Sequence, residues 1–341
     1  MKRILLTSTL ILSAAATALP GATLPENLNR ISFGPRVGFN IKAEFSNNPT
    51  AFTPGALTAP GDAIGGINHE YDDGYVRVDS SGNAGGTTWN WGYVDNTQVV
   101  GDTMEFHASQ ANAAHGPSNS TAEDDPQYGV ELIYQRLVAP LGHSGLWGWE
   151  AAFSFTDLDI DHSSRGTGAN TVITDSYALN GVVPPMAPHN GTFAGPGALL
   201  GDTPTRTITS DTMTSRESLT GEIFAFRFGP FAEWDVGERL SVSLGAGLTL
   251  APTMLDYKFS ETTENALGGT TNNSGSSSKT RLLYGGYINT MLRYDIDGSW
   301  GFFAGAQFQN MSSMKLSSGT REARLDQSAT LYGTAGLSFQ F

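Results

Sequence analysis

Apolar and polar residues alternate along this chain with a period of two in eight separate runs. Successive side chains of a β-strand point to opposite faces, so each run predicts a strand with one apolar face. In residues 240–250, for example, every even-numbered position is Leu, Val or Ala and every odd-numbered position is Ser, Gly or Thr. A tilted strand crosses a bilayer in about 9–11 residues, which is the scale of these runs. The eight runs are residues 31–45, 128–135, 147–156, 224–234, 240–250, 281–294, 300–309 and 331–341.

The segments between the runs alternate between short and long. Short turns around Gly142, Gly237 and Gly298 follow the second, fourth and sixth runs, and longer segments follow the others. Outer-membrane barrels have short periplasmic turns and long extracellular loops. The sequence therefore predicts one all-β domain, a transmembrane antiparallel up-and-down barrel of eight strands. Its large extracellular insertions are expected at about 46–126 and 161–217.

Two other architectures remain open at this point. Residues 87–94 and 102–109 also look strand-like and would give a ten-stranded barrel, but each offers only a few residues to lipid. A secreted β-sandwich alternates as well, with a polar face that meets water. The polar faces here are mostly Gly, Ser, Asn and Gln with isolated charges, which favours a narrow lumen over a hydrated surface.

The N-terminus is typical of an exported protein. Lys2 and Arg3 precede an apolar stretch at residues 4–12, and Ala16-Thr17-Ala18 fits a cleavage site for small residues. This order predicts a secretory signal peptide over residues 1–18 and a barrel over 19–341. The alternative, an N-terminal membrane anchor, would need a longer apolar stretch. The predicted location is the bacterial outer membrane.

The composition of the chain excludes several classes of function. The chain has 33 acidic and 19 basic residues and no cysteine. A strongly acidic chain is a poor ligand for a phosphate backbone, so no nucleic-acid partner is expected. The absence of cysteine removes disulfides, thiolate zinc sites and thiol catalysis. No phosphate-binding loop, dinucleotide fingerprint or G-x-S-x-G motif is present, and no cofactor is expected.

The chain ends on an alternating strand, Leu337-Ser338-Phe339-Gln340-Phe341. With the export signal, the alternating runs and the loop pattern, this ending resembles the small bacterial outer-membrane β-barrel proteins, the OmpA/OmpX/OmpW-like group. The resemblance covers the strands and not the long loops. It implies that Leu337, Phe339 and Phe341 are the signal read by the barrel assembly machinery. It also implies outer-membrane lipid and lipopolysaccharide as surroundings, with an unknown extracellular ligand.

Placing the polar side of each run inward predicts which charges line the lumen. Eight strands leave an interior that side chains can fill, and buried charges there should pair. The expectation is two layers of ion pairs that close the lumen; a polar pore lining is the alternative. The charged candidates are Arg36, Lys42, Glu44, Glu131, Glu150, Glu222, Arg227, Glu233, Arg281 and Arg293. Aromatic residues near strand ends predict an interfacial girdle: Trp147, Trp149, Trp234, Tyr284, Tyr294 and Trp300.

The long loops offer only weak chemical candidates. Segment 46–126 carries 11 acidic residues and one base, Arg77. Weak cation-site candidates there are Asp72, Asp73, Asp124 and Asp125, although none has EF-hand spacing. His162-Ser163-Ser164 could be compared with the loop residues of enzymatic barrels, but the sequence favours an ordinary polar loop. The sequence therefore predicts no catalytic residues and no metal site.

The expected role is structural or surface-interacting. The alternative is a narrow porin-like channel for small solutes, and the second alternative is a membrane-embedded lipid-modifying enzyme.

Overall fold

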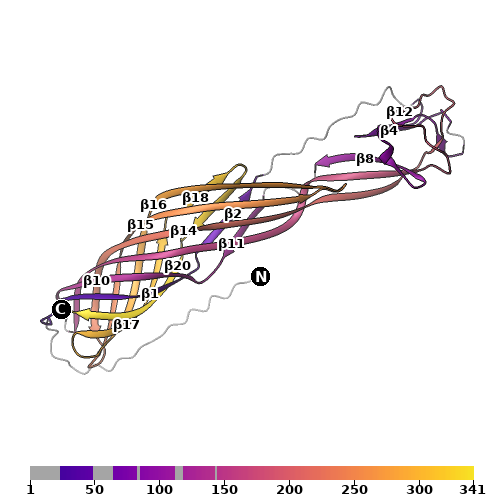
Figure 1. Ribbon diagram of the computed structural model, residues 1–341. Helices are drawn as coiled ribbons and strands as arrows, with labels where there is room; N and C mark the ends of the chain where they lie inside the picture. Colours follow the sequence, from indigo (N-terminus) through magenta and orange to yellow (C-terminus); the bar gives the residue numbers. More distant parts are fainter. Residues whose placement is uncertain (1–23, 49–63, 83–84, 112–117, 143) are drawn as a thin grey trace.

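Eight antiparallel strands form a closed ring in the computed structural model (Figure 1), which describes residues 24–48, 64–82, 85–111, 118–142 and 144–341. The ring closes because β1 pairs with β10 on one side and with β20 on the other. Around the barrel the strands are β1 (Asn29–Phe39), β10 (Gln127–Leu141), β11 (Gly145–Ala178), β14 (Thr205–Asp235), β15 (Leu240–Glu264), β16 (Thr270–Asp295), β17 (Trp300–Met311) and β20 (Thr330–Gln340). The predicted eight-stranded barrel is confirmed. The predicted signal peptide lies outside the described residues.

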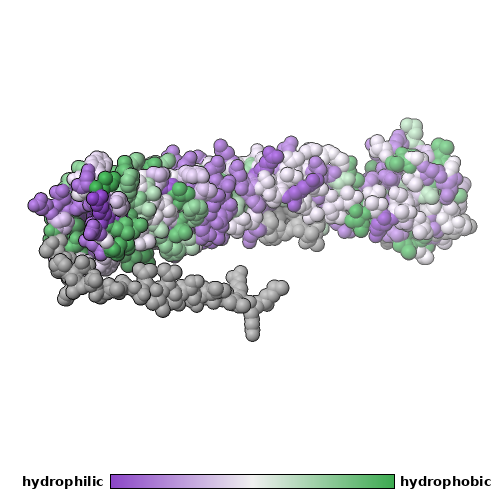
Figure 2. Space-filling view, turned by 90° about the horizontal axis from the view of Figure 1, so that it is seen from below, coloured by the Kyte–Doolittle hydropathy of each residue, from purple (hydrophilic) through white to green (hydrophobic). Residues whose placement is uncertain are grey.

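Exposed apolar side chains on all eight ring strands form a belt at the end of the barrel that carries the short turns and the C-terminus (Figure 1); Figure 2 shows one face of this belt in green. Side chains that would belong in a core are exposed there, for example Leu248 at 73% and Phe228 at 58%. Because this ring is closed and its exposed side is apolar, lipid is the solvent that fits it. All six girdle residues are on the strands of this belt. Trp149 stacks on Phe228 with ring centroids 5.3 Å apart, and Trp300 packs on Phe339 at 4.9 Å.

Beyond the belt the barrel becomes two packed sheets. The outer halves of β11, β14, β15 and β16 form one of them. The second has the order β18-β19-β2-β9, with β18 (Met314–Ser318), β19 (Arg321–Asp326), β2 (Lys42–Asn47) and β9 (Ser118–Glu123). An apolar core fills the space between them, including Phe45, Leu158, Leu255, Leu283, Leu316 and Leu325. Polarity is thus inverted relative to the belt: here the apolar side chains point inward, and charged side chains such as Lys42 and Glu44 lie on the outer wall, although Arg321 and Glu217 are buried.

Asn40 is where the first run changes face. Phe33 and Phe39 point outward on β1, whereas Ile41, just before β2, and Phe45, within β2, are buried in the core. Asn40 makes this switch with a left-handed backbone, φ 60°. Its N–H donates to Asp125 Oδ2 at 2.6 Å, and its Nδ2 donates to Ala329 O at 2.7 Å. One uninterrupted alternation in the sequence therefore serves two opposite faces.

A small head lies past the outer end of the two-sheet region (Figure 1). The long β11–β14 hairpin carries it, and β8 pairs with the last residues of β11. Its elements are β3 (Ile67–Tyr71), β4 (Gly74–Val78), β5 (Thr87–Thr88), β6 (Trp91–Tyr93), the 3-10 turn η1 (Asn96–Gln98), β7 (Val99–Val100), β8 (Thr103–Ala111), β12 (His189–Asn190) and β13 (Leu200–Gly201). Its core includes Trp91, Tyr93, Met104, Phe106, Tyr177 and Leu200. No helix in the described ranges is long and apolar enough to cross a membrane.

The head shows what the two predicted insertions become. Residues 87–94 and 102–109, the candidates for a ninth and tenth membrane strand, belong to the head and not to the ring. Much of segment 161–217 is strand, because β11 runs to Ala178 and β14 begins at Thr205. The two insertions fold together: β12 pairs with β6 and β13 pairs with β5.

The left-handed conformation at Asn40 yields a stability prediction. Asn40→Val should lower the free energy of unfolding by about 2 kcal/mol, since a β-branched residue is strained there. Asn40→Gly accepts the same φ and should cost only about 1 kcal/mol, for the lost side-chain hydrogen bond. Urea unfolding in lipid vesicles, followed by tryptophan fluorescence, measures both. Equal losses for the two variants would contradict the role assigned to the backbone.

Candidate functional site: a charged lumen and an outer head

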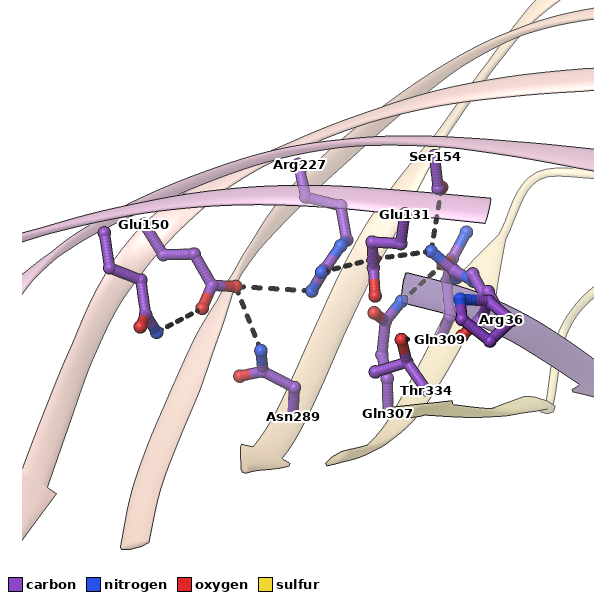
Figure 3. A network of polar contacts seen from close by, with 11 residues as sticks. Arg36, Glu131, Glu150, Ser154, Arg227, Asn289, Gln307, Gln309 and Thr334 are labelled. Carbon is purple, nitrogen blue, oxygen red and sulfur yellow. Dashed lines mark hydrogen bonds and ion pairs between the residues drawn. The ribbon is translucent and has the colours of Figure 1, made fainter. Parts of the chain in front are cut away.

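A chain of four buried charges crosses the membrane part of the lumen (Figure 3). Glu131 Oε1 accepts from Arg36 Nη1 at 2.8 Å and from Arg227 Nη2 at 2.6 Å. Arg227 Nη1 then reaches Glu150 Oε1 at 3.3 Å. The four side chains come from β1, β10, β11 and β14, so the network ties four neighbouring strands together. Two arginines and two glutamates leave it with no net charge.

Neutral groups complete this network. Arg36 also donates to Ser154 Oγ at 2.8 Å and to Gln309 Oε1 at 3.3 Å. Glu150 accepts from Asn289 Nδ2 and from Gln135 Nε2, each at 2.9 Å. These partners bring β16 and β17 into the network, which matters because a half-satisfied buried charge is costly.

Two aromatic rings also cover the arginines. Arg36 lies over the ring of Tyr332, 3.6 Å from its centroid, and Arg227 lies 4.7 Å from that of Tyr287. Such cation–π contacts stabilise a desolvated guanidinium.

A second ion pair closes the lumen nearer the short turns. Arg30 donates to Glu233 through both terminal nitrogens, at 2.6 and 3.0 Å. The paired planar groups give the bidentate geometry typical of strong Arg–carboxylate contacts. Gln135 accepts from Arg30 through Oε1 at 3.3 Å and donates from Nε2 to Glu150, which links the two layers. Arg293 lies at the same end and donates to Ser338 Oγ at 3.1 Å.

The lumen is filled rather than open. A cavity lined by Glu131, Arg227 and Asn289 has a volume of about 10 Å³, which is room for a single water molecule. Above it the apolar core of the outer region begins at Tyr332 and Leu283. Still farther out, Arg321 pairs with Glu217 at 3.0 Å and with Glu261. A solute would therefore have to displace charged, apolar and again charged layers.

Six of the ten predicted lumen charges lie inside: Arg36, Glu131, Glu150, Arg227, Glu233 and Arg293. The other four require correction. Lys42 pairs with Glu123 at 3.5 Å, Glu44 with Arg324 at 3.2 Å, and Glu222 is exposed, all on the outer wall. Arg281 is exposed and donates to Ser313 O at 3.5 Å, between β16 and β18. All four lie beyond the belt, where polar side chains face water.

The sequence did not predict that Arg30 and Arg321 are buried. Arg30 shares the even-numbered inward face of Arg36, but it precedes the first apolar residue of its run. That shared parity is the signal that could have found it. Arg321 lies in a segment interpreted as a loop, and no local pattern marks its burial.

The residues of the terminal strand point outward. Leu337 and Phe341 are 49% and 46% exposed, and Phe339 stacks on Phe341 at 6.0 Å. Phe341 N–H donates to Asn29 O at 2.9 Å, and Asn29 N–H donates to Phe341 O at 3.1 Å. The last residue thus helps to close the ring against its first strand.

Three of the four cation candidates, Asp72, Asp73 and Asp125, accept hydrogen bonds from backbone N–H groups through their carboxylates. Asp72 Oδ2 accepts from Ser109 N–H at 2.6 Å, and Asp73 Oδ1 accepts from His107 N–H at 2.8 Å. Asp125 holds the N–H of Asn40, and the Asp124 carbonyl accepts from Gln127. Within the described residues, no three His, Asp or Glu side chains are placed to hold a metal.

His107 is a titratable group of the head that Asp73 holds in place. Its Nδ1 lies 2.6 Å from Asp73 Oδ2, and this hydrogen bond raises the pKa of His107 above its ordinary value. A second polar cluster forms where the head meets the hairpin: Arg206 binds both oxygens of Asp175, at 2.8 and 2.7 Å, and Tyr71 donates to the same carboxylate. Although burial raises the pKa of Asp175, these bonds lower it overall.

His162, the residue weighed for catalysis, packs its ring on Phe45 at 5.8 Å, and Ser163 and Ser164 are exposed.

The chain was compared with known proteins. No family model and no curated protein matches it. Among solved structures, the attachment invasion locus protein Ail of Yersinia pestis, in complex with the heparin analogue sucrose octasulfate, is 10% identical with a TM-score of 0.23, covering 92% of this chain and 99% of that one. The outer membrane protease OmpT of Escherichia coli is 10% identical with a TM-score of 0.30, covering 93% and 97%. The toluene transporter TodX of Pseudomonas putida is 8% identical with a TM-score of 0.19, covering 93% and 90%. At these identities and TM-scores the similarities carry no argument, and the evidence for the barrel is its own strand pairing.

The shared carboxylate of the lumen yields a mutational prediction. Glu131→Gln should lower the free energy of unfolding by about 3–5 kcal/mol, because two buried guanidinium groups lose their counter-charge. Glu44→Gln is the matched control on the outer wall and should change it by less than about 1 kcal/mol, as exposed pairs contribute little. Urea titrations in lipid vesicles compare the two. Similar losses for both would contradict the importance of the network.

The His107–Asp73 contact yields a pH prediction. The folded pKa of His107 is raised, so the contact stabilises fully below the unfolded value of about 6.5 and is lost as pH rises through the folded value. Hydrogen exchange of residues 71–75 and 103–109, corrected for intrinsic rates, should therefore be slower at pH 5.5 than at pH 8.5. His107→Gln should remove this difference. If it persists in the variant, another group is responsible.

Proposed function

We propose that this protein is a closed outer-membrane barrel whose task is to hold a folded head outside the cell, in a structural or surface-interaction role. The observation that carries the proposal is the filled lumen. Buried ion pairs and an apolar core occupy the path that a solute would take. The apolar belt fits lipid, and the polar outer region fits water and the sugars of lipopolysaccharide.

Two features of the outer region support a surface role. The head has an apolar core of its own, so it is a folded unit and not a loose loop. The hairpin that carries it is continuous with two strands of the barrel wall. A barrel that served only as an anchor would not need such a support. Membership of the OmpA/OmpX/OmpW-like group, and recognition of Phe341 by the barrel assembly machinery, belong to the same proposal.

The closed lumen has an electrical consequence. Purified protein in planar bilayers should show no stable single-channel conductance, because no continuous water path crosses the charged layers. Arg30→Ser together with Glu233→Ser removes one ion pair and its bulk but leaves the layer around Glu131 and the apolar core in place, so this variant should also remain closed. Steady channels in the unmodified protein would overturn closure and favour the narrow channel.

The location can be tested separately on membrane fractions. The protein should be found in the outer-membrane fraction and should migrate differently on gels with and without boiling, since a closed barrel resists detergent. A soluble protein with unchanged mobility would contradict the proposal.

A further inference from the structure

The head carries exposed apolar side chains that lipid does not cover. Val183 and Met186 are 87% and 82% exposed, and Val94 and Val100 are 52% and 49% exposed. They lie on two loops, residues 94–102 and 179–188, which we call the paired loops. The second of these follows the outer end of β11. Figure 2 shows green side chains on the head, separated from the green belt by a mostly purple and white region. Contact with the membrane therefore does not explain them.

Hydrogen bonds fix the paired loops to each other. Ala187 N–H donates to Asn96 Oδ1 at 2.9 Å, and Gly181 N–H donates to Asp102 Oδ1 at 2.9 Å. Tyr93 OH also donates to Pro185 O. The apolar side chains are thus presented on an ordered surface, and less entropy is lost on binding than from free loops.

Charge narrows the kind of partner that could cover this surface. Asp95 and Asp102 are exposed on the same loops. The described head residues, 64–82, 85–111 and 171–206, contain nine acidic residues and two basic ones. Of the two bases, Arg77 is buried and Arg206 binds Asp175. A negative field of this kind attracts cations and repels acidic partners.

We propose that the paired loops bind a cationic polypeptide segment that also carries apolar side chains. Its apolar groups would cover Val183 and Met186, and its Lys or Arg side chains would meet Asp95 and Asp102. The inference rests on the proposed function, which places the head outside the cell where such a segment can reach it.

The test uses the full chain in nanodiscs of zwitterionic phosphatidylcholine. The probe is a fluorescent eight-residue peptide of alternating Lys and Leu, followed by anisotropy with empty nanodiscs subtracted. Peptides of alternating Glu and Leu, and of alternating Lys and Ser, are the comparisons. Saturable binding of the Lys–Leu peptide, roughly tenfold tighter than that of either comparison, is the expected result. Equal binding of the Glu–Leu peptide overturns the proposal.

Paired substitutions then locate the binding. Val183→Ser with Met186→Ser should weaken binding roughly tenfold. Asp95→Asn with Asp102→Asn keeps an oxygen for the local hydrogen bonds and should weaken it roughly threefold at low ionic strength, with less effect in high salt. The matched control joins Ile208→Ser, 63% exposed, to Asp256→Asn on the outer wall, and should leave binding unchanged. Equal effects of control and loop variants overturn the assignment.

A reporter covers the case in which a loop variant fails to fold. The chain has no cysteine, so Thr97→Cys provides a single labelling site on the first loop. A polarity-sensitive dye there should change emission on saturation with the Lys–Leu peptide. No change overturns the site even if the peptide binds elsewhere. Gel mobility and conductance report separately on the barrel, so failure of the proposed function is distinguishable from failure of this inference.

Discussion

Glu131 holds the middle of the barrel together. Its carboxylate lies between two guanidinium groups, one from the neighbouring strand β1 and one from β14, which is two strands away on the other side, and these side chains are 2% exposed or less. In so narrow a lumen, each charge needs a partner because water has almost no room. The alternation of arginine and glutamate, extended by Gln135, Asn289 and Gln309, satisfies that need with side chains from six strands. The closed lumen follows from electrostatics as much as from size.

The second organising constraint is the change of solvent along the barrel axis. Where lipid surrounds the wall, apolar groups face out; where water surrounds it, they turn inward and form a core. Continuous strands achieve this by changing composition: β11 places Glu150 inside in the belt and Leu158 inside beyond it. The first strand instead keeps its apolar parity and changes face at Asn40. The strands therefore meet the change from lipid to water in two ways: by a change of composition, or by a change of the face that points inward.

The change of solvent along the barrel axis also explains which features could be predicted from the sequence and which could not. Period-two patterning predicted the strands and their number, because lipid imposes a strict alternation on one face. It predicted the lumen position of Glu131 and Arg227 for the same reason. It misplaced Lys42 and Glu44, since parity records which residues share a face and not which solvent that face meets. The fold of the head could not be predicted from the sequence, because its strand pairings, such as Leu200 with Thr88, join segments far apart in the chain.

The length of β11 has a consequence for what the cell presents to its surroundings. At about 3.3 Å per residue, a strand of 34 residues extends on the order of 110 Å along its path. The hydrocarbon core of a bilayer takes up only about 30 Å of that, measured along its normal. On the proposed function, the remainder is a spacer that lifts the head clear of the lipid headgroups. If the head lies outside the cell, as proposed, an antibody or a phage would meet it before the membrane wall, and selection would act mainly on the head.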